Sequence, residues 1–147
     1  MDKPNYDALK LENQLCFPLY ACAKELVRHY KPYLDELDLT YTQYILMMVL
    51  WEKKAQTVKE LGRALYLDSG TLTPVLKKLE KKGYLTRSRS TEDERNLIVT
   101  VTEKGEALKA QAVHVPRQIG QCLELTAEEA ATFYGLLYKV LGTLTTD

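Results

Sequence analysis

Apolar residues recur at helical spacing near both ends of the chain. Between residues 11 and 26 they follow one another at steps of three or four, at Leu11, Leu15, Leu19, Cys22 and Leu26. Residues 127–144 show similar spacing, with Phe133, Leu136, Leu137, Val140, Leu141 and Leu144. Such spacing gives a helix one apolar face. Because a small single chain has little to cover two wide apolar faces, the pattern favours a dimer interface.

Prolines modify the predicted terminal helices. Pro18 has no N–H for the carbonyl of Gln14, so a bend or a late helix start is expected there. The residue before a proline avoids the helical region, so Lys31-Pro32 predicts the end of the first helix. Val115-Pro116 predicts an interruption or a bend in the helix that begins near residue 102.

Three further helix starts carry a Thr followed three residues later by Gln or Glu, which is the capping-box pattern. These pairs are Thr40 with Gln43, Thr57 with Glu60, and Thr126 with Glu129. After the first pair comes the nearly all-apolar run YILMMVLW, residues 44–51. This run is too short to span a membrane and therefore predicts a buried helix.

The middle of the chain predicts a helix followed by a β-hairpin. TLTPVLKKLEKKG follows a DSG loop and predicts a helix over 71–83, with Pro74 near its first turn and Gly83 as its stop. Runs rich in β-branched residues at 84–89 and 96–101 predict two strands, joined by the charged loop STEDER. Four helices, two strands and two helices, in this order, predict a mainly α fold with a small β-hairpin wing, a winged helix-turn-helix.

The predicted domain organisation follows from this order. We expect one domain over residues 1–147. Its winged-helix lobe is predicted at about 40–104, and its dimerisation helices at about 8–32 and 105–145.

Charge is distributed unevenly although it cancels overall, with 20 basic and 20 acidic residues. Residues 53–104 hold twelve basic and seven acidic residues, a net charge of +5. A chance fluctuation on a solvated surface is one explanation. The other is a middle module that meets the phosphates of DNA.

In a winged helix-turn-helix, the DNA-reading helix lays its first residues against base edges in the major groove. Here that helix is the one predicted over 71–83. On that basis the candidates that face bases are Ser69, Thr71, Thr73 and Lys77, and Lys78 is the candidate that meets phosphate. The hairpin adds the candidate DNA-binding residues Arg87, Asp93 and Arg95. In the wing, Asp93 can orient Arg95 by a charge-assisted hydrogen bond, and a narrow minor groove attracts such an arginine. The lysine run alone is better explained as the solvated face of an amphipathic helix, whereas the helix, the hairpin and the uneven charge together favour DNA binding.

Other features limit the class of protein. Three cysteines without a pairing pattern and an N-terminus without an apolar signal core favour the reducing cytoplasm. His29 and His114 are isolated, so neither a metal site nor a cofactor is predicted. A thiol peroxidase is disfavoured, because the chain has no Cys-x-x-Cys motif and no Gly-rich phosphate loop. We therefore expect a protein that is not an enzyme.

The segment LYLDSGTLTPVLKKLEKKGYLTRSRSTEDERNLIVTVTEKG, with Asp93-x-Arg95 in its wing, resembles the DNA-binding core of the MarR-type winged-helix regulators. Within that family, KLENQLCF resembles the organic-hydroperoxide-sensing branch, OhrR. The resemblance implies that Cys16 is the peroxide-reactive cysteine near a dimer interface. It also implies that Tyr20, Tyr30 and Tyr41 hydrogen-bond the thiol, some of them from the partner subunit.

Cys16 alone would be interpreted as a core cysteine, because free cysteines are often buried. The resemblance reverses this, since phenol donors help a reactive thiolate to form. Oxidation would give a sulfenic acid, which a second thiol can trap. Some members of the branch use a cysteine in the C-terminal part, and Cys122 is the candidate here. A small cellular thiol is the alternative partner.

The sequence thus predicts a homodimeric repressor that binds an inverted-repeat operator and releases it when an organic hydroperoxide oxidises Cys16. The alternative is a MarR-type regulator released by a bound small aromatic or lipophilic ligand, with Cys16 only structural.

Overall fold

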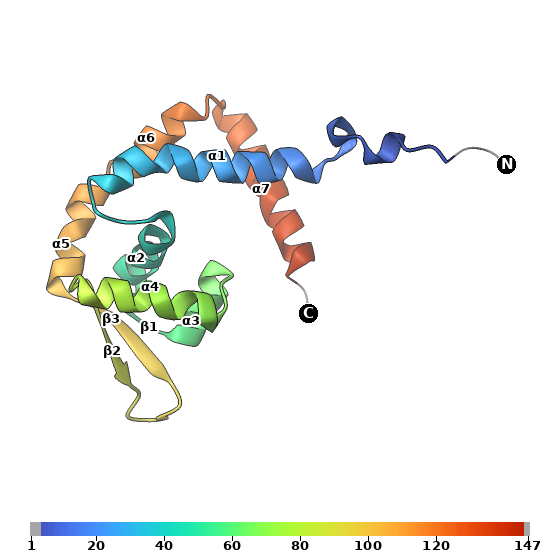
Figure 1. Cartoon of the computed structure of the whole chain (residues 1–147). Helices are drawn as coiled ribbons and strands as arrows, with labels where there is room; N and C mark the ends of the chain where they lie inside the picture. The colour runs from blue at the N-terminus through green and yellow to red at the C-terminus, as the bar shows by residue number, and fades with distance from the viewer. Residues whose placement is uncertain (1–3, 146–147) are drawn as a thin grey trace. The chain divides into compact units, whose positions relative to one another are not determined.

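The computed structural model describes residues 4–145 (Figure 1). Along the chain these residues divide into two compact units, with the boundary between Val115 and Pro116. The first unit holds two 3-10 helices, η1 (Asp7–Leu9) and η2 (Leu11–Asn13), then α1 (Cys16–Asp35), α2 (Tyr41–Lys53), β1 (Ala55–Thr57), α3 (Val58–Leu65), α4 (Ser69–Lys81), β2 (Leu85–Arg89), β3 (Leu97–Val101) and α5 (Glu103–Ala112). At the boundary α6 (Val115–Cys122) begins, and α7 (Ala127–Leu144) follows. This composition confirms the predicted mainly α fold with a hairpin wing. The predicted lobe and dimerisation boundaries stay predictions.

The sheet is antiparallel, with the strand order β1-β3-β2. In the predicted hairpin, Leu85 of β2 pairs with Val101 of β3, and Arg89 pairs with Leu97. The strand β1 was not predicted, because three residues are too few to show an alternating pattern. Ala55 of β1 pairs with Thr100 of β3. The hairpin therefore projects from a three-stranded base.

The core of the first unit lies between α2, α3, α4 and the sheet. Its fully buried side chains are Leu46, Met47, Leu50, Leu61, Leu72, Leu76, Leu79, Leu85 and Val99. Each such side chain contributes about 1.5–3 kcal/mol by leaving water. The run YILMMVLW supplies three of them, which confirms the predicted buried helix. This packing fixes α4 against the wing.

The helix α1 starts late, at Cys16, and ends later than predicted. It begins at Cys16, so Pro18 lies in its first turn, where no backbone N–H partner is needed. The predicted end at Lys31-Pro32 is wrong, because α1 continues to Asp35 with Pro32 inside it. Leu34 is only 2% exposed. Burial of Leu34 favours one more helical turn and offsets the hydrogen bond that Pro32 cannot make.

The helix α4 begins before the predicted position. Asp68 is its N-cap and accepts a hydrogen bond from the backbone N of Thr71 at 2.7 Å, so Ser69 and Gly70 belong to the helix and not to a loop. Pro74 is consequently the sixth residue of α4 and lies beyond its first turn. Gly83, with φ of +84°, ends this region as predicted, since only glycine takes that conformation without strain.

The three predicted capping boxes are present at the starts of α2, α3 and α7. The interruption near Pro116 is confirmed as well, because α5 ends at Ala112 and α6 begins at Val115. Local side-chain chemistry thus decides where most of these helices begin.

Candidate functional site

The first turn of α4 presents hydroxyl groups to solvent. Ser69 and Thr71 are exposed, and Thr73 is half-buried. Thr73 donates its hydroxyl hydrogen to the carbonyl of Ser69 at 2.7 Å. The backbone N–H of Thr71 holds the pKa of the Asp68 carboxyl below its usual range. This turn is therefore well ordered, and its hydroxyl groups can meet a base edge or a phosphate.

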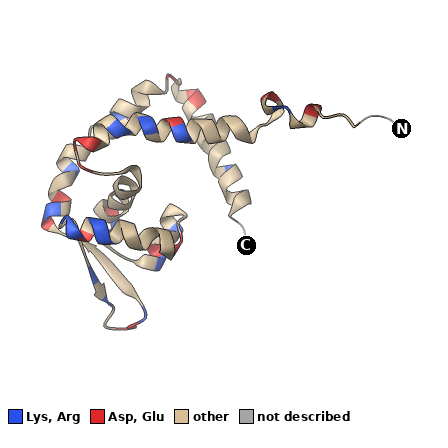
Figure 2. Ribbon diagram, viewed as in Figure 1, with Lys and Arg blue, Asp and Glu red and all other residues tan. Residues whose placement is uncertain are grey.

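A groove of about 690 Å³ lies beside this turn, between α3, α4 and the wing. Its lining includes four basic side chains, from Lys59, Arg63, Arg87 and Arg95. The sequence reasoning counted Lys59 and Arg63 only toward net charge. Their spacing of four residues places both side chains on one face of α3, and this spacing could have indicated a basic face. Figure 2 shows further Lys and Arg residues toward the end of α4.

The predicted DNA-binding residue Arg87 is held by α4. Its Nη2 lies 3.0 Å from Oε1 of Glu80, and its backbone N donates to Oε2 of the same carboxylate at 3.1 Å. The arginine lowers the pKa of the Glu80 carboxyl, chiefly through the side-chain hydrogen bond. Only 21% of the Arg87 side chain is exposed. This pair attaches the edge strand β2 to α4, so it fixes the wing relative to the helix.

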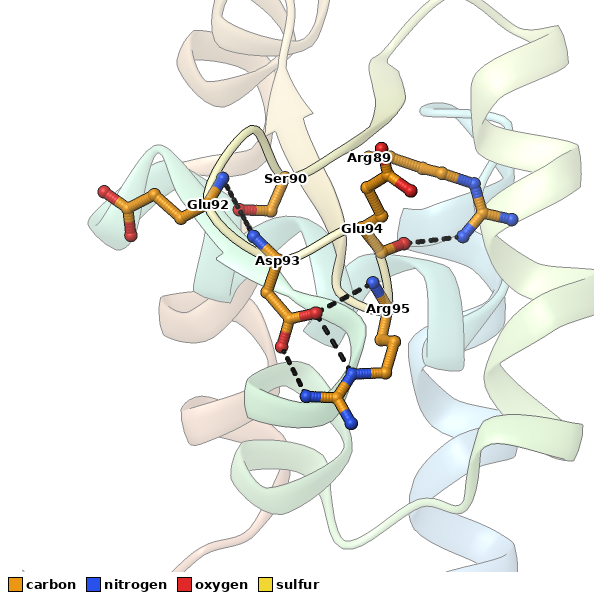
Figure 3. Close-up of polar contacts among 6 residues, drawn as sticks. All are labelled: Arg89, Ser90, Glu92, Asp93, Glu94 and Arg95. Carbon is orange, nitrogen blue, oxygen red and sulfur yellow. Dashed lines mark hydrogen bonds and ion pairs between the residues drawn. The ribbon is translucent and has the colours of Figure 1, made fainter.

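The wing tip has the contact that the sequence predicts (Figure 3). Asp93 accepts hydrogen bonds from Nε of Arg95 at 3.2 Å and from its Nη2 at 3.4 Å. These bonds lower the pKa of the Asp93 carboxyl. The Arg95 side chain is 90% exposed. Arg89 closes the other side of the loop by donating to the carbonyl of Glu94 at 2.8 Å. The guanidinium of Arg95 is thus oriented and accessible.

The thiol site begins at the first turn of α1. Cys16 is the first residue of that helix, and its side chain is exposed. Tyr20 lies one turn further and is exposed too. Because Cys16 is exposed, the core-cysteine interpretation does not hold for it in the single chain. The backbone N–H groups of this first turn have no partner within the helix.

Tyr30 and Tyr41 lie together at the other end of α1. Their ring centroids are 4.9 Å apart, and Tyr44 joins them at 5.8 Å from Tyr30. Burial, followed by the neighbouring tyrosines, raises the pKa of Tyr30 to about 12. Burial also raises the pKa of Tyr41. Both phenols therefore keep their hydrogen at neutral pH and can donate it.

The single chain does not bring these phenols to the thiol. Tyr30 follows Cys16 by fourteen residues on one continuous helix, which separates them by about 21 Å along its axis. Of the predicted tyrosines, only Tyr20 lies near its own Cys16. The sequence reasoning missed Tyr44, whose place three residues after Tyr41 on α2 is the signal for it.

Cys122 lies in the second unit. It is exposed, and its Sγ is 3.3 Å from the carbonyl of Gln118. Within residues 4–145, no group of three His, Cys, Asp or Glu side chains is arranged to hold a metal ion. No helix in the same range is long and apolar enough to cross a membrane.

Known proteins resemble this arrangement over nearly the whole chain. A family model described as transcriptional regulator SarA/Rot matches residues 28–112. The organic hydroperoxide resistance transcriptional regulator of Bacillus subtilis is 48% identical over 139 residues, which cover 95% of each chain. A mutant MarR from E. coli, solved in complex with operator DNA, has a TM-score of 0.81 and 29% identity, covering 95% of this chain and 99% of the other.

This chain belongs to the MarR-type family of winged-helix regulators. The similarity to the Bacillus protein places it in the organic-hydroperoxide branch, as predicted. Reduced AbfR bound to DNA is a further structural relative, with a TM-score of 0.76 and 36% identity over 95% of this chain and 98% of the other. AbfR, a Staphylococcus epidermidis protein, has also been solved with a disulfide formed, at a TM-score of 0.66 and 35% identity over 95% and 96% of the chains.

The candidate DNA-binding surface and the candidate thiol site lie on different parts of the fold. The first turn of α4, the groove and the wing form an exposed basic surface. The thiol lies at the start of α1, and the Tyr30–Tyr41 pair lies where the later part of α1 contacts the start of α2. Neither lines the groove.

Proposed function

We propose that this protein is a homodimeric repressor that senses organic hydroperoxides by oxidation of Cys16 and then releases its operator. The observation that carries the proposal is the arrangement along α1. An exposed thiol lies at one end, and two half-buried, protonated phenols lie at the other. Two copies of α1 running in opposite directions would place each thiol beside the partner subunit's phenols.

The apolar surface supports the dimer. Leu34 is the only buried residue of α1, and α7 buries none among residues 4–145. Large apolar side chains are exposed on both helices, including Phe17, Leu19, Phe133, Leu136 and Val140. On each helix, exposed apolar area of this kind is typical of an interface. A second copy of the chain is the partner that would cover it.

DNA binding is assigned to the basic surface of the winged unit. Ser69, Thr71, Thr73 and Lys77 would face bases in the major groove, and Lys78 would meet phosphate. Arg95, oriented by Asp93, would enter the flanking minor groove. Arg87 would act mainly through its pairing with Glu80, by holding the wing in position. An inverted-repeat operator matches a two-fold dimer, with half-sites about 34–36 Å apart.

The chemistry at Cys16 is a two-electron oxidation. The thiolate attacks one oxygen of the hydroperoxide, the O–O bond breaks, and the products are a sulfenate and an alcohol. Protonated phenols stabilise the thiolate by donating hydrogen bonds, and they lose that role when sulfur carries oxygen. The sulfenic acid is then trapped either by the partner subunit's Cys122 or by a small thiol.

The test measures binding of the protein to a fluorescent copy of the DNA upstream of its own gene, before and after cumene hydroperoxide. Wild type is expected to bind when reduced and to dissociate after oxidation, whereas Cys16→Ser stays bound. Cys22→Ser is the matched control, because Cys22 is exposed on the same helix. It is expected to behave as wild type.

If Cys16→Ser dissociates with wild type, or neither dissociates, Cys16 is not the switch. A regulator released by a bound aromatic ligand then becomes the better description. Non-reducing electrophoresis of Cys122→Ser decides between the two fates of the sulfenic acid, since only an intersubunit disulfide doubles the apparent mass.

A further inference from the structure

Lys82 attaches the end of α4 to the turn between α1 and α2. Its Nζ donates to the backbone carbonyl of Asp38, and lies 3.3 Å from Oδ2 of the same residue. It also donates to Oε1 of Gln43 at 3.4 Å. Only 27% of the Lys82 side chain is exposed. A partly buried ammonium with several oxygen acceptors is held more firmly than an exposed surface pair.

The acceptors belong to a rigid turn. Asp38 has φ of +53°, and the backbone N of Leu39 donates to the carbonyl of Leu34 at 3.0 Å across the turn. Gln43 is 3% exposed and completes the capping box of α2 with Thr40. Lys82 therefore contacts the ordered start of α2, and a displacement of this start also displaces the acceptors.

The donor is fixed on its own side as well. Lys82 follows the last residue of α4, and its backbone N donates to the carbonyl of Lys78 at 3.1 Å. Its carbonyl accepts a hydrogen bond from Nζ of Lys104, in α5, at 2.8 Å. Hydrogen bonds thus hold both the backbone of Lys82 and its ammonium group. Because the backbone is held at the end of α4, a displacement of the ammonium group also displaces the end of α4.

The tyrosine cluster adjoins this link. Tyr41 is the first residue of α2, directly after the cap residue Thr40, and its ring contacts Tyr30. A displacement of these rings shifts the start of α2 and the turn before it. The apolar contacts of α2 with α4 are not directional, but the Lys82 hydrogen bonds are.

We propose that Lys82 is a positioning residue that couples the thiol site to α4. It passes a displacement of the Tyr30–Tyr41 pair, through the turn at Asp38, to the orientation of the DNA-reading helix. This inference rests on the proposed function, because it needs oxidation at Cys16 as the input. It adds the route by which that input reaches DNA.

The test compares Lys82→Met with Lys81→Met. Both changes remove one positive charge and keep an unbranched apolar stem. Lys81 lines the same surface pocket as Lys82, but its side chain makes no hydrogen bond or ion pair within residues 4–145. The readout is the ratio of Kd for the upstream DNA after and before cumene hydroperoxide. Thermal melting of each variant checks that it folds.

Lys82→Met is expected to lower this ratio by about tenfold, which is within the range of measured couplings between sites. Lys81→Met should keep the wild-type ratio, and Lys82→Arg, which retains a donor, should keep most of it. An unchanged ratio in Lys82→Met overturns the coupling. Should Lys82→Met fail to fold, Lys82→Gln replaces it, because it removes the charge and shortens the side chain but keeps it polar. A wild-type ratio in that variant overturns the coupling equally. Failure of the proposed function is distinct, because wild type itself would then show a ratio near one.

Discussion

A dimer of two complementary variants tests whether the Cys16 thiol of one subunit is stabilised by hydrogen bonds from Tyr30 and Tyr41 of the other. One chain carries Cys16→Ser, and the other carries Tyr30→Phe with Tyr41→Phe. The only Cys16 of this heterodimer lies in the chain without the two phenols. It faces the intact Tyr30 and Tyr41 of the Cys16→Ser chain only if the site forms between subunits.

The structure sets the expected magnitude. Cys16 and Tyr30 of one chain are about 21 Å apart along α1, whereas a hydrogen bond requires roughly 3 Å. A hydrogen bond to a charged group contributes about 1.5–3 kcal/mol, so losing even one should slow oxidation by about tenfold or more. The Tyr30→Phe, Tyr41→Phe homodimer should therefore oxidise at least about tenfold more slowly than wild type.

The assay traps the sulfenic acid with dimedone and follows the Cys16 peptide by mass spectrometry. Separate tags on the two chains allow the heterodimer to be purified. Its single Cys16 should oxidise at the wild-type rate. A rate equal to that of the double-Phe homodimer would refute the reasoning, because each thiol would then depend on phenols of its own chain.

Three further outcomes are expected. Arg95→Ala should weaken DNA binding by about 1–3 kcal/mol, and Asp93→Asn should weaken it less, both measured by fluorescence anisotropy. Because the pKa of Glu80 is lowered in the folded state, its contribution to stability is present above its unfolded value of about 4.3 and is lost as pH falls through the folded value. Glu80→Gln should flatten the fall in melting temperature below about pH 4.3. Gly105→Ala places a Cβ 2.2 Å from the carbonyl oxygen of Tyr84 and should lower stability to urea by about 2 kcal/mol.

Sequence reasoning predicted those parts of the fold that local chemistry decides. The Thr–Gln and Thr–Glu pairs mark three helix starts because each satisfies two otherwise unpaired N–H groups at the helix end. The same local logic predicted the Asp93–Arg95 contact, whose partners are two residues apart. Short range in sequence is what made these features predictable.

The missed features depend on contacts across the fold. The turn after Lys31 stays helical because Leu34 is buried, and no local pattern reports this. The strand β1 exists because β3 is already paired on its other side and offers a free edge. The Glu80–Arg87 pair joins a helix to a strand and depends on how these two elements pack. Such features need the tertiary arrangement.

The helix α2 explains how one chain can carry both sites. Its first turn holds Tyr41 and Tyr44 against α1, and its later turns supply the core residues Leu46, Met47 and Leu50, on which the DNA-reading unit packs. On the proposed coupling, the hydrogen bonds of Lys82 to Asp38 and Gln43 pass a shift of that first turn to α4. A change at the phenols then reaches α4 without any contact between the thiol and DNA. Half-sites that must match a fixed spacing on DNA make even a small rotation of α4 sufficient for release.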